Sequence, residues 1–131
     1  LTKEIEKHIA EFEPTCLITH NQYDVNIDHR KCYEAILPAL RPVKNNSISL
    51  AMSFEIISSS EWNYHNPFLA NYYIDITDVI EEKIKACLEY RGEILNANHS
   101  RSIDTIKTLA AYRGQQAGYK YAEAFNLIVK R

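Results

Sequence analysis

The sequence predicts an α/β protein with an open, layered and mostly parallel sheet flanked by helices. The first observation behind this prediction is the order of hydrophobic patterns along the 131 residues, which runs helix, strand, helix, strand, strand, helix, helix, strand. The second is that the stretches rich in Asn, Ser or Pro are short, as expected for loops between elements and not for linkers between domains. These stretches are 42–47, 58–67 and 96–102. We therefore expect a single domain over residues 1–131.

Two helices are expected in the first third of the chain. Residues 2–13 form the first, because their apolar side chains recur at helical spacing and Pro14 ends the pattern. The second begins at about residue 29, with Asp28 as its expected N-cap, and Pro38 shortens or kinks it. The apolar positions of the two helices are Ile5, Ile9, Phe12, Cys32, Ala35, Ile36, Ala39 and Leu40.

Two further helices follow in the second half. Asp78 and Glu81 have the spacing of a capping box, which predicts the start of a helix whose apolar stripe extends to Leu95. The last helix begins near Ser102 and ends at about Gly118, whose missing Cβ permits a left-handed C-terminal cap.

Four strands complete the prediction. Residues 15–19 form a short apolar run that fits a buried strand. In 47–57 apolar residues alternate with small or polar ones, which is the period of a strand. Shorter strand patterns lie at 72–76 and 122–129.

Composition excludes several classes of function. The 15 Lys and Arg residues against 17 Asp and Glu give a net charge of −2, and the basic residues are dispersed, so no surface for nucleic acid is indicated. With only three glycines, no glycine-rich phosphate loop can be formed. No apolar run reaches the roughly 18–20 residues of a membrane-spanning helix.

The three cysteines fit neither a disulfide framework nor a metal knuckle. Cys16, Cys32 and Cys87 are an odd number at wide spacings, each within an apolar pattern. We interpret them as buried thiols in a reducing compartment, and expect a cytoplasmic protein.

The most polar segment, residues 19–30, follows the first strand. In α/β sheets ligands bind beyond the carboxyl ends of the strands, which is where this segment lies. Asp24 and Asn26 are also ordinary turn residues. His29, at a helix amino terminus, is favoured in the neutral form that ligates a metal. The segment is therefore either an ordinary turn or part of a binding site.

Five segments, in order, resemble a known family. They are 19–42 with its Asp-Val-Asn-Ile-Asp-His-Arg core, Glu-Ile-Ile-Ser-Ser-Ser-Glu-Trp at 55–62, Tyr-Ile-Asp-Ile-Thr at 73–77, His-Ser-Arg-Ser at 99–102, and 112–125. Together they resemble the PIG-L (LmbE-like) family of zinc-dependent N-acetylglucosaminyl deacetylases. The resemblance covers nearly the whole chain.

The resemblance implies a Rossmann-like fold and hydrolysis of the N-acetyl group of a GlcNAc-containing glycoconjugate. His29 matches a ligand of the family's single Zn²⁺, whose other ligands are a His and an Asp of an amino-terminal His-Pro-Asp-Asp-Glu motif. Asn26 stands where many members have a His thought to stabilise the oxyanion, and its amide can still donate a hydrogen bond there. Asp28 would fix the loop or orient a ligand.

The first motif of the family is absent from residues 1–131. On the family pattern the chain supplies one zinc ligand of three and no general base, so we expect it to be inactive alone. It would be the carboxyl-terminal part of the domain, completed by a missing amino-terminal portion or a partner half. The alternative is a non-catalytic, sugar-binding or oligomer-forming fragment. Self-association is expected too, because strand 15–19 would present an unpaired apolar edge.

Four other residues are candidate substrate contacts. His20 and Asp24 lie in the polar segment itself. Trp62 would stack on a sugar, or else be a packed indole beside a turn. Arg113 would reach an anionic or hydroxyl-rich ligand, or form an ion pair with a carboxylate such as Asp24. A separate metal site is a further hypothesis without support from spacing, and its residues would be His20, His29, His65 and His99.

Overall fold

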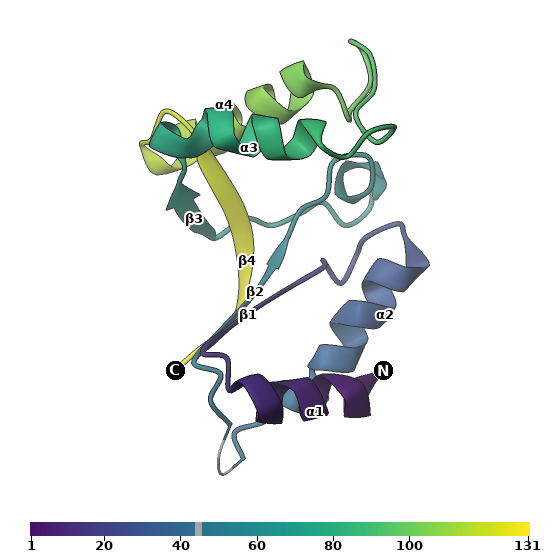
Figure 1. The fold of residues 1–131 in the computed structure, drawn as a ribbon, viewed down its shortest axis with the longest axis vertical. Helices are drawn as coiled ribbons and strands as arrows, with labels where there is room; N and C mark the ends of the chain where they lie inside the picture. Colours follow the sequence, from purple (N-terminus) through teal and green to yellow (C-terminus); the bar gives the residue numbers. More distant parts are fainter. Residues whose placement is uncertain (44–45) are drawn as a thin grey trace. The chain divides into compact units, whose positions relative to one another are not determined.

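The computed structural model describes residues 1–43 and 46–131 (Figure 1). Its helices and strands are α1 (Thr2–Phe12), β1 (Cys16–Thr19), α2 (Ile27–Ile36), β2 (Leu50–Phe54), β3 (Tyr72–Asp75), α3 (Ile80–Leu88), α4 (Ile103–Ala117) and β4 (Ala122–Lys130). Short 3₁₀ turns are η1 (Pro38–Leu40), η2 (Ser60–Trp62) and η3 (Thr77–Val79). The chain divides into two compact units, the first with residues 1–70 and 125–131 and the second with residues 71–124.

The strands form one mixed sheet in the order β1-β2-β4-β3. β1 and β2 are parallel, with Cys16 opposite Leu50 and Thr19 opposite Ser53. β4 runs antiparallel to β2, with a register shift between Ala51 and Met52. The predicted α/β class is confirmed. The sheet is mixed rather than mostly parallel as predicted, because β2 and β4 are antiparallel. A hydrophobic period of two predicts a strand but carries no information on its direction.

In the first unit, α1, α2 and η1 pack on one side of the parallel pair. The buried core consists of Ile36, Leu40, Ile48 and Ala51, against which Ile5, Ile9, Leu17, Ile128 and Val129 pack. Ala51 is fully buried. Because side chains two apart on a strand share a face, Ser53 belongs to the same helix-bearing face as Ala51.

The second unit packs α3 against α4, which lie beside each other in Figure 1. Its core consists of Ile76, Ile80, Ala110 and the partly buried Tyr121. Ion pairs of 2.6 Å join Lys107 to Glu81 and Lys83 to Glu123. The predicted ends of α4 are confirmed, since the Ser102 hydroxyl accepts from the amide of Thr105 and Gly118 has a φ of 78°.

Two predicted helix starts are wrong. α2 begins at Ile27, and its N-cap is Asn26 rather than Asp28, because the Asn26 side chain accepts the Asp28 amide proton at 2.9 Å. The capping box of Asp78 and Glu81 does not form. Instead Asp75 accepts from the Thr77 amide at 2.9 Å, and a 3₁₀ turn leads into α3 without a side-chain cap.

Other expectations differ in extent. α3 ends at Leu88, so Leu95 is not on its stripe. α2 ends at Ile36 and Pro38 opens the 3₁₀ turn η1, as the expected shortening requires. The cysteines are free, but Cys16 is exposed and the other two are half-buried, so their expected burial is wrong. Lys44 and Asn45, inside the predicted loop 42–47, lie outside the described residues. In the described ranges no helix combines the length and the apolar character needed to cross a membrane.

Candidate functional site

The polar residues of the first unit gather at the carboxyl ends of β1 and β2. β1 and β2 are parallel and Thr19 lies opposite Ser53, so the segments that follow the two strands leave the sheet at the same end. The segment after β1 leads to α2, and the segment after β2 leads to η2. The contacts between these two segments define the candidate site.

Asp24 is the centre of these contacts, although it has no exposed surface. Its Oδ1 accepts from the amide of Asn26 at 2.8 Å and from the hydroxyl of Ser59, and its Oδ2 accepts from the hydroxyl of Ser60 at 3.4 Å. Nδ1 of His29 lies 3.2 Å from the same Oδ1. Burial raises the pKa of Asp24, but the donors from Ser59, Asn26 and His29 outweigh it, so that this pKa is lowered. Asp24 is therefore a buried carboxylate.

Two imidazoles stack beside this carboxylate. The rings of His20 and His29 have centroids 4.0 Å apart and an interplanar angle of 4°, and the ring of Phe54 lies 5.1 Å from that of His20. Burial, and then the neighbouring His29, lower the pKa of His20 against an opposing effect of Asp24. This favours a neutral His20.

Further hydrogen bonds fix the backbone of the segment after β1. Nη1 of Arg30 donates to the carbonyl oxygens of Asp24 at 2.6 Å and Val25 at 3.0 Å. Nδ2 of Asn63 donates to the carbonyl oxygen of Tyr23 at 2.6 Å. The helix α2 and the segment after β2 thus both hold the turn that carries Asp24.

The segment after β2 is closed on itself. The carboxylate of Glu61 accepts from the amides of Ser58 at 2.6 Å and Ser59 at 3.1 Å. The hydroxyl of Ser60 accepts from the amide of Ile56 at 2.8 Å. Both serines therefore reach Asp24 from a structured turn rather than from an open loop.

Asn26 and Asp28 flank the start of α2. The Asn26 Oδ1 is engaged with the Asp28 amide, so its Nδ2 is the group left to donate to a ligand. Asp28 lies in the first turn and is exposed. The catalytic roles of both residues stay predictions.

The described residues do not form a complete zinc site. In stacked, nearly parallel rings the nitrogen lone pairs run side by side, so His20 and His29 do not converge on one tetrahedral ion with Zn–N bonds of about 2.0–2.1 Å. Within residues 1–43 and 46–131 no group of three His, Cys, Asp or Glu side chains is arranged to hold a metal. The separate histidine site thus stays a prediction that no cluster among the described residues supports.

His29 does fit the role of a single ligand. Its Nδ1 is buried, and in the described part of the chain no atom makes a hydrogen bond to it with full geometry. Asp24 lies at contact distance from that nitrogen. A carboxylate behind one ring nitrogen is the usual support of a histidine that ligates a metal through the other.

The two remaining candidates lie elsewhere. Trp62 ends η2 with 46% of its surface exposed, so its indole is not a packed core residue. Arg113 belongs to α4 in the second unit, where it donates to Gln116 at 2.9 Å and lies 5.3 Å from the ring centroid of Tyr112. The structure brings His20, Asp24, Asn26, Asp28 and His29 together in the first unit. Sequence reasoning missed the Ser59 contact to Asp24 and the Arg30 clamp.

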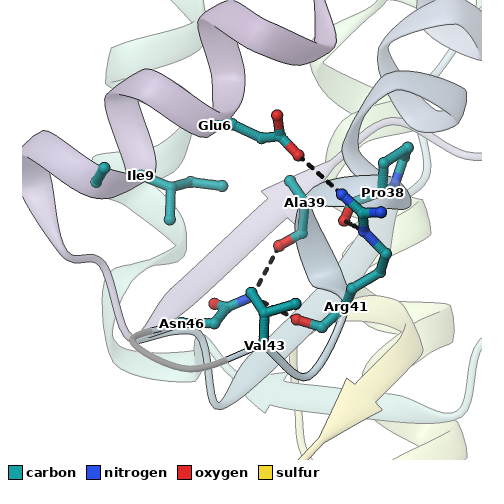
Figure 2. Close-up of a pocket in the computed structure, with 8 residues that line it drawn as sticks. Glu6, Ile9, Pro38, Ala39, Arg41, Val43 and Asn46 are labelled. Carbon is teal, nitrogen blue, oxygen red and sulfur yellow. Dashed lines mark hydrogen bonds and ion pairs between the residues drawn. The ribbon is translucent and has the colours of Figure 1, made fainter.

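A separate pocket of about 200 Å³ lies between α1 and η1 (Figure 2). It is lined by Glu6, Ile9, Ala10, Pro38, Ala39, Arg41, Val43 and Asn46. Its polar groups already bind each other or the backbone. Arg41 pairs with Glu6 at 3.4 Å and donates to the Pro38 carbonyl at 2.7 Å, and Asn46 donates to the Ala39 carbonyl at 2.8 Å. None of the predicted site residues lines this pocket.

No family model matches the sequence. The chain is homologous to a diacetylchitobiose deacetylase of Thermococcus kodakarensis, with 26% identity over 110 residues that cover 81% of this chain and 41% of the relative. The chain therefore spans less than half the length of that curated relative.

Three solved structures share the fold. The N,N'-diacetylchitobiose deacetylase of Pyrococcus horikoshii, solved with an inhibitor, matches with a TM-score of 0.70 and 20% identity over 97% of this chain and 50% of that one. The conserved protein TT1542 of Thermus thermophilus matches with a TM-score of 0.76 and 16% identity over 99% of this chain and 59% of TT1542. GalB of Pseudomonas putida, a 4-carboxy-2-hydroxymuconate hydratase, matches with a TM-score of 0.74 and 18% identity. This match covers 99% of this chain and 58% of GalB. One fold thus carries two chemistries, and the reaction must be argued from the site.

Proposed function

We propose that this chain is part of a zinc-dependent deacetylase that removes the N-acetyl group from a GlcNAc-containing saccharide or glycoconjugate. The observation that carries the proposal is the homology to a diacetylchitobiose deacetylase. The arrangement at the end of β1 supports it, because a buried carboxylate stands behind an imidazole at the edge where α/β proteins bind ligands.

His29 would supply one zinc ligand through Nε2, and the other ligands would come from residues beyond those described. Bound zinc supplies a water of lowered pKa and polarises the acetyl carbonyl. Asn26 would donate from Nδ2 to the developing oxyanion while its Oδ1 caps α2. Asp28 would help fix the loop.

The saccharide would be held by the remaining polar and aromatic candidates. The exposed face of Trp62 would stack on a sugar ring, and His20 and the turn around Asp24 would border the acetyl end. Arg113 stays a predicted ligand contact of the second unit. A missing amino-terminal portion or a partner half would complete the site, so we propose that the 131-residue chain alone is inactive.

The first test is zinc content by elemental analysis after dialysis of the purified chain against trace metal. We expect near-zero zinc occupancy for the chain alone. We expect stoichiometric zinc for the completed protein, which is this chain together with the proposed amino-terminal portion or partner half. Stoichiometric zinc in the chain alone, lost in His29→Ala, would contradict a site completed from elsewhere.

The second test is release of acetate from diacetylchitobiose by the completed protein. His29→Ala should abolish zinc binding and acetate release together. His65→Ala is the matched control, because His65 is exposed. Its hydrogen bond to the Asn63 side chain is donated by the backbone amide, which the substitution keeps. Normal zinc and turnover in His29→Ala would overturn the proposed function.

A second candidate function is a non-catalytic, sugar-binding module. The exposed indole of Trp62 is the observation in its favour, because an aromatic face can stack on a sugar ring. It is distinguished by titrating diacetylchitobiose into the completed protein with zinc present. Binding without acetate release would support the module, whereas turnover would exclude it.

A further inference from the structure

We propose that Asp24 is a positioning residue for His29: its carboxylate holds the proton on Nδ1, so that Nε2 carries the lone pair available to a metal. The inference rests on the proposed function, because a metal ligand is what gives this tautomer its purpose. It assigns to Asp24 a task different from the direct substrate contact that its place in a polar loop indicates.

The partners of the Asp24 carboxylate favour this task. Its oxygens contact the amide of Asn26 and the hydroxyls of Ser59 and Ser60, which are all neutral donors. The guanidinium of Arg30 binds the carbonyl oxygen of Asp24 and not its carboxylate. His29 is therefore the group among these contacts that can share a proton or a positive charge with the carboxylate.

The ring of His29 is held in one plane. His20 stacks on it at 4.0 Å and 4°, which restricts tilting of the imidazole. Its Nδ1 is buried, and in the described ranges no acceptor, Asp24 included, makes a hydrogen bond of full geometry to it. A buried ring nitrogen that is left unpaired costs free energy, so a bond from Nδ1–H to the oxygen 3.2 Å away is favoured. Nε2, on the opposite side of the ring, then has no proton.

Ser59 extends this control to the segment after β2. Its hydroxyl donates to the oxygen of Asp24 that faces His29, and its amide is fixed by Glu61. The position of the Asp24 carboxylate is thus fixed in part by Ser59, which lies 35 residues later in the chain. We expect Ser59 to support Asp24 and not to act on His29 directly.

The test is the tautomer of His29, measured by long-range ¹H–¹⁵N correlation spectra of the labelled chain at a pH well above the usual histidine pKa of about 6.5. We expect the Nδ1–H form in the wild type, and a shift toward the Nε2–H form in Asp24→Leu, which has no acceptor. A purely structural role of Asp24 would not change the tautomer of a folded protein. An Nε2–H tautomer in the wild type would overturn the proposal without any variant.

Two variants sharpen the result. Glu34→Leu removes an exposed carboxylate from the same helix, α2, and should leave the tautomer unchanged. Ser59→Ala keeps the Asp24 carboxylate and should keep the Nδ1–H form. Should Asp24→Leu fail to fold, an Nε2–H form in Ser59→Ala would contradict the proposal.

The outcome is separable from that of the proposed function. An Nδ1–H tautomer together with normal zinc in His29→Ala would reject the zinc role and keep the Asp24 contact. An Nε2–H tautomer together with zinc lost in His29→Ala would reject the positioning role alone. In the completed protein, loss of such a carboxylate typically weakens metal affinity by about 10–100-fold, and we expect that for Asp24→Leu.

Discussion

At the scale of single residues, Asn26 has a separate task for each end of its side-chain amide. Its Oδ1 caps α2 by accepting from the Asp28 amide at 2.9 Å. We predict that Asn26→Ala lowers the free energy of unfolding by about 0.5–2 kcal/mol, because an N-cap acceptor is lost. Urea unfolding followed by circular dichroism measures this change. Asn26→Ser keeps an acceptor oxygen, so a loss as large as that of the alanine variant would contradict the capping account.

The same residue allows a test of its proposed oxyanion role. Asn26→Asp keeps the capping oxygen but removes the Nδ2 donor. We predict that it retains the stability of the wild type and loses deacetylation in the completed protein, typically by about 10²–10³-fold in kcat for one oxyanion donor. Acetate release measures this effect. Near-normal kcat in Asn26→Asp would show that Asn26 only caps the helix.

The site was predictable at the level of residue type and not of contact. The polar loop with His29 could be identified because two histidines and two aspartates are concentrated after a strand pattern. The burial of Asp24 could not, because its hydroxyl partners lie 35 and 36 residues later. An Asp in a polar loop has the same local pattern whether it faces water or becomes the centre of a network.

At the scale of elements, α4 contains a glycine with an unusual requirement. A Cβ on Gly114 would lie 2.7 Å from the Tyr119 carbonyl oxygen and 2.8 Å from that of Lys120, both backbone atoms. Gly→Ala inside a helix normally stabilises it by up to about 1 kcal/mol. We predict the opposite sign for Gly114→Ala, a loss of about 1–3 kcal/mol from overpacking, measured by thermal or urea unfolding. The exposed Gln115→Ala is the control, and a stabilised Gly114→Ala would contradict the close approach.

The α3–α4 pair makes a prediction on pH. Lys107 lowers the pKa of Glu81, and Glu81 raises the pKa of Lys107. The Glu81 contribution to stability is therefore present above its unfolded pKa of about 4.3 and lost as pH falls through the folded value. The Lys107 contribution is present below about 10.4 and lost as pH rises through its folded value.

We therefore predict a coupling free energy between the two residues at neutral pH that disappears in acid. A double-mutant cycle of Glu81→Gln and Lys107→Gln, measured by urea unfolding at about pH 7 and about pH 2, tests it. The neighbouring exposed Glu82→Gln should show no coupling to Lys107 at either pH. Equal coupling at both pH values would contradict an ionic origin.

The elements themselves were largely predictable, and their ends less so. The last helix could be placed at both ends because Ser102 and Gly118 are strong local signals. The start of α2 could not, since Asn26 and Asp28 are both good N-caps and the choice depends on backbone geometry. The start of α3 depends on Asp75, which the sequence places at the end of a strand. The antiparallel direction of β4 has no local signal at all.

At the scale of the whole molecule, the match in fold is broader than the match in chemistry. Structures described as a deacetylase and as a hydratase both align with at least 97% of this chain, and the chain covers 50–59% of the structures compared. The scaffold therefore accounts for where the site lies. The proposed reaction has to be tested at the residues of the candidate site at the end of β1.

The sheet edge makes the last prediction. In the sheet formed by the described residues β1 is an edge strand, and Ile18 on it has 51% of its surface exposed beside the exposed Cys16. An edge with unpaired backbone groups and apolar side chains favours pairing with another chain, so we expect the 131-residue chain to self-associate. Sedimentation velocity over a concentration series measures this. Ile18→Lys should weaken association because a charge on an edge strand opposes pairing, whereas Tyr64→Lys, at an exposed residue outside the strands, should not. A wild-type chain that stays monomeric at high concentration would contradict the prediction.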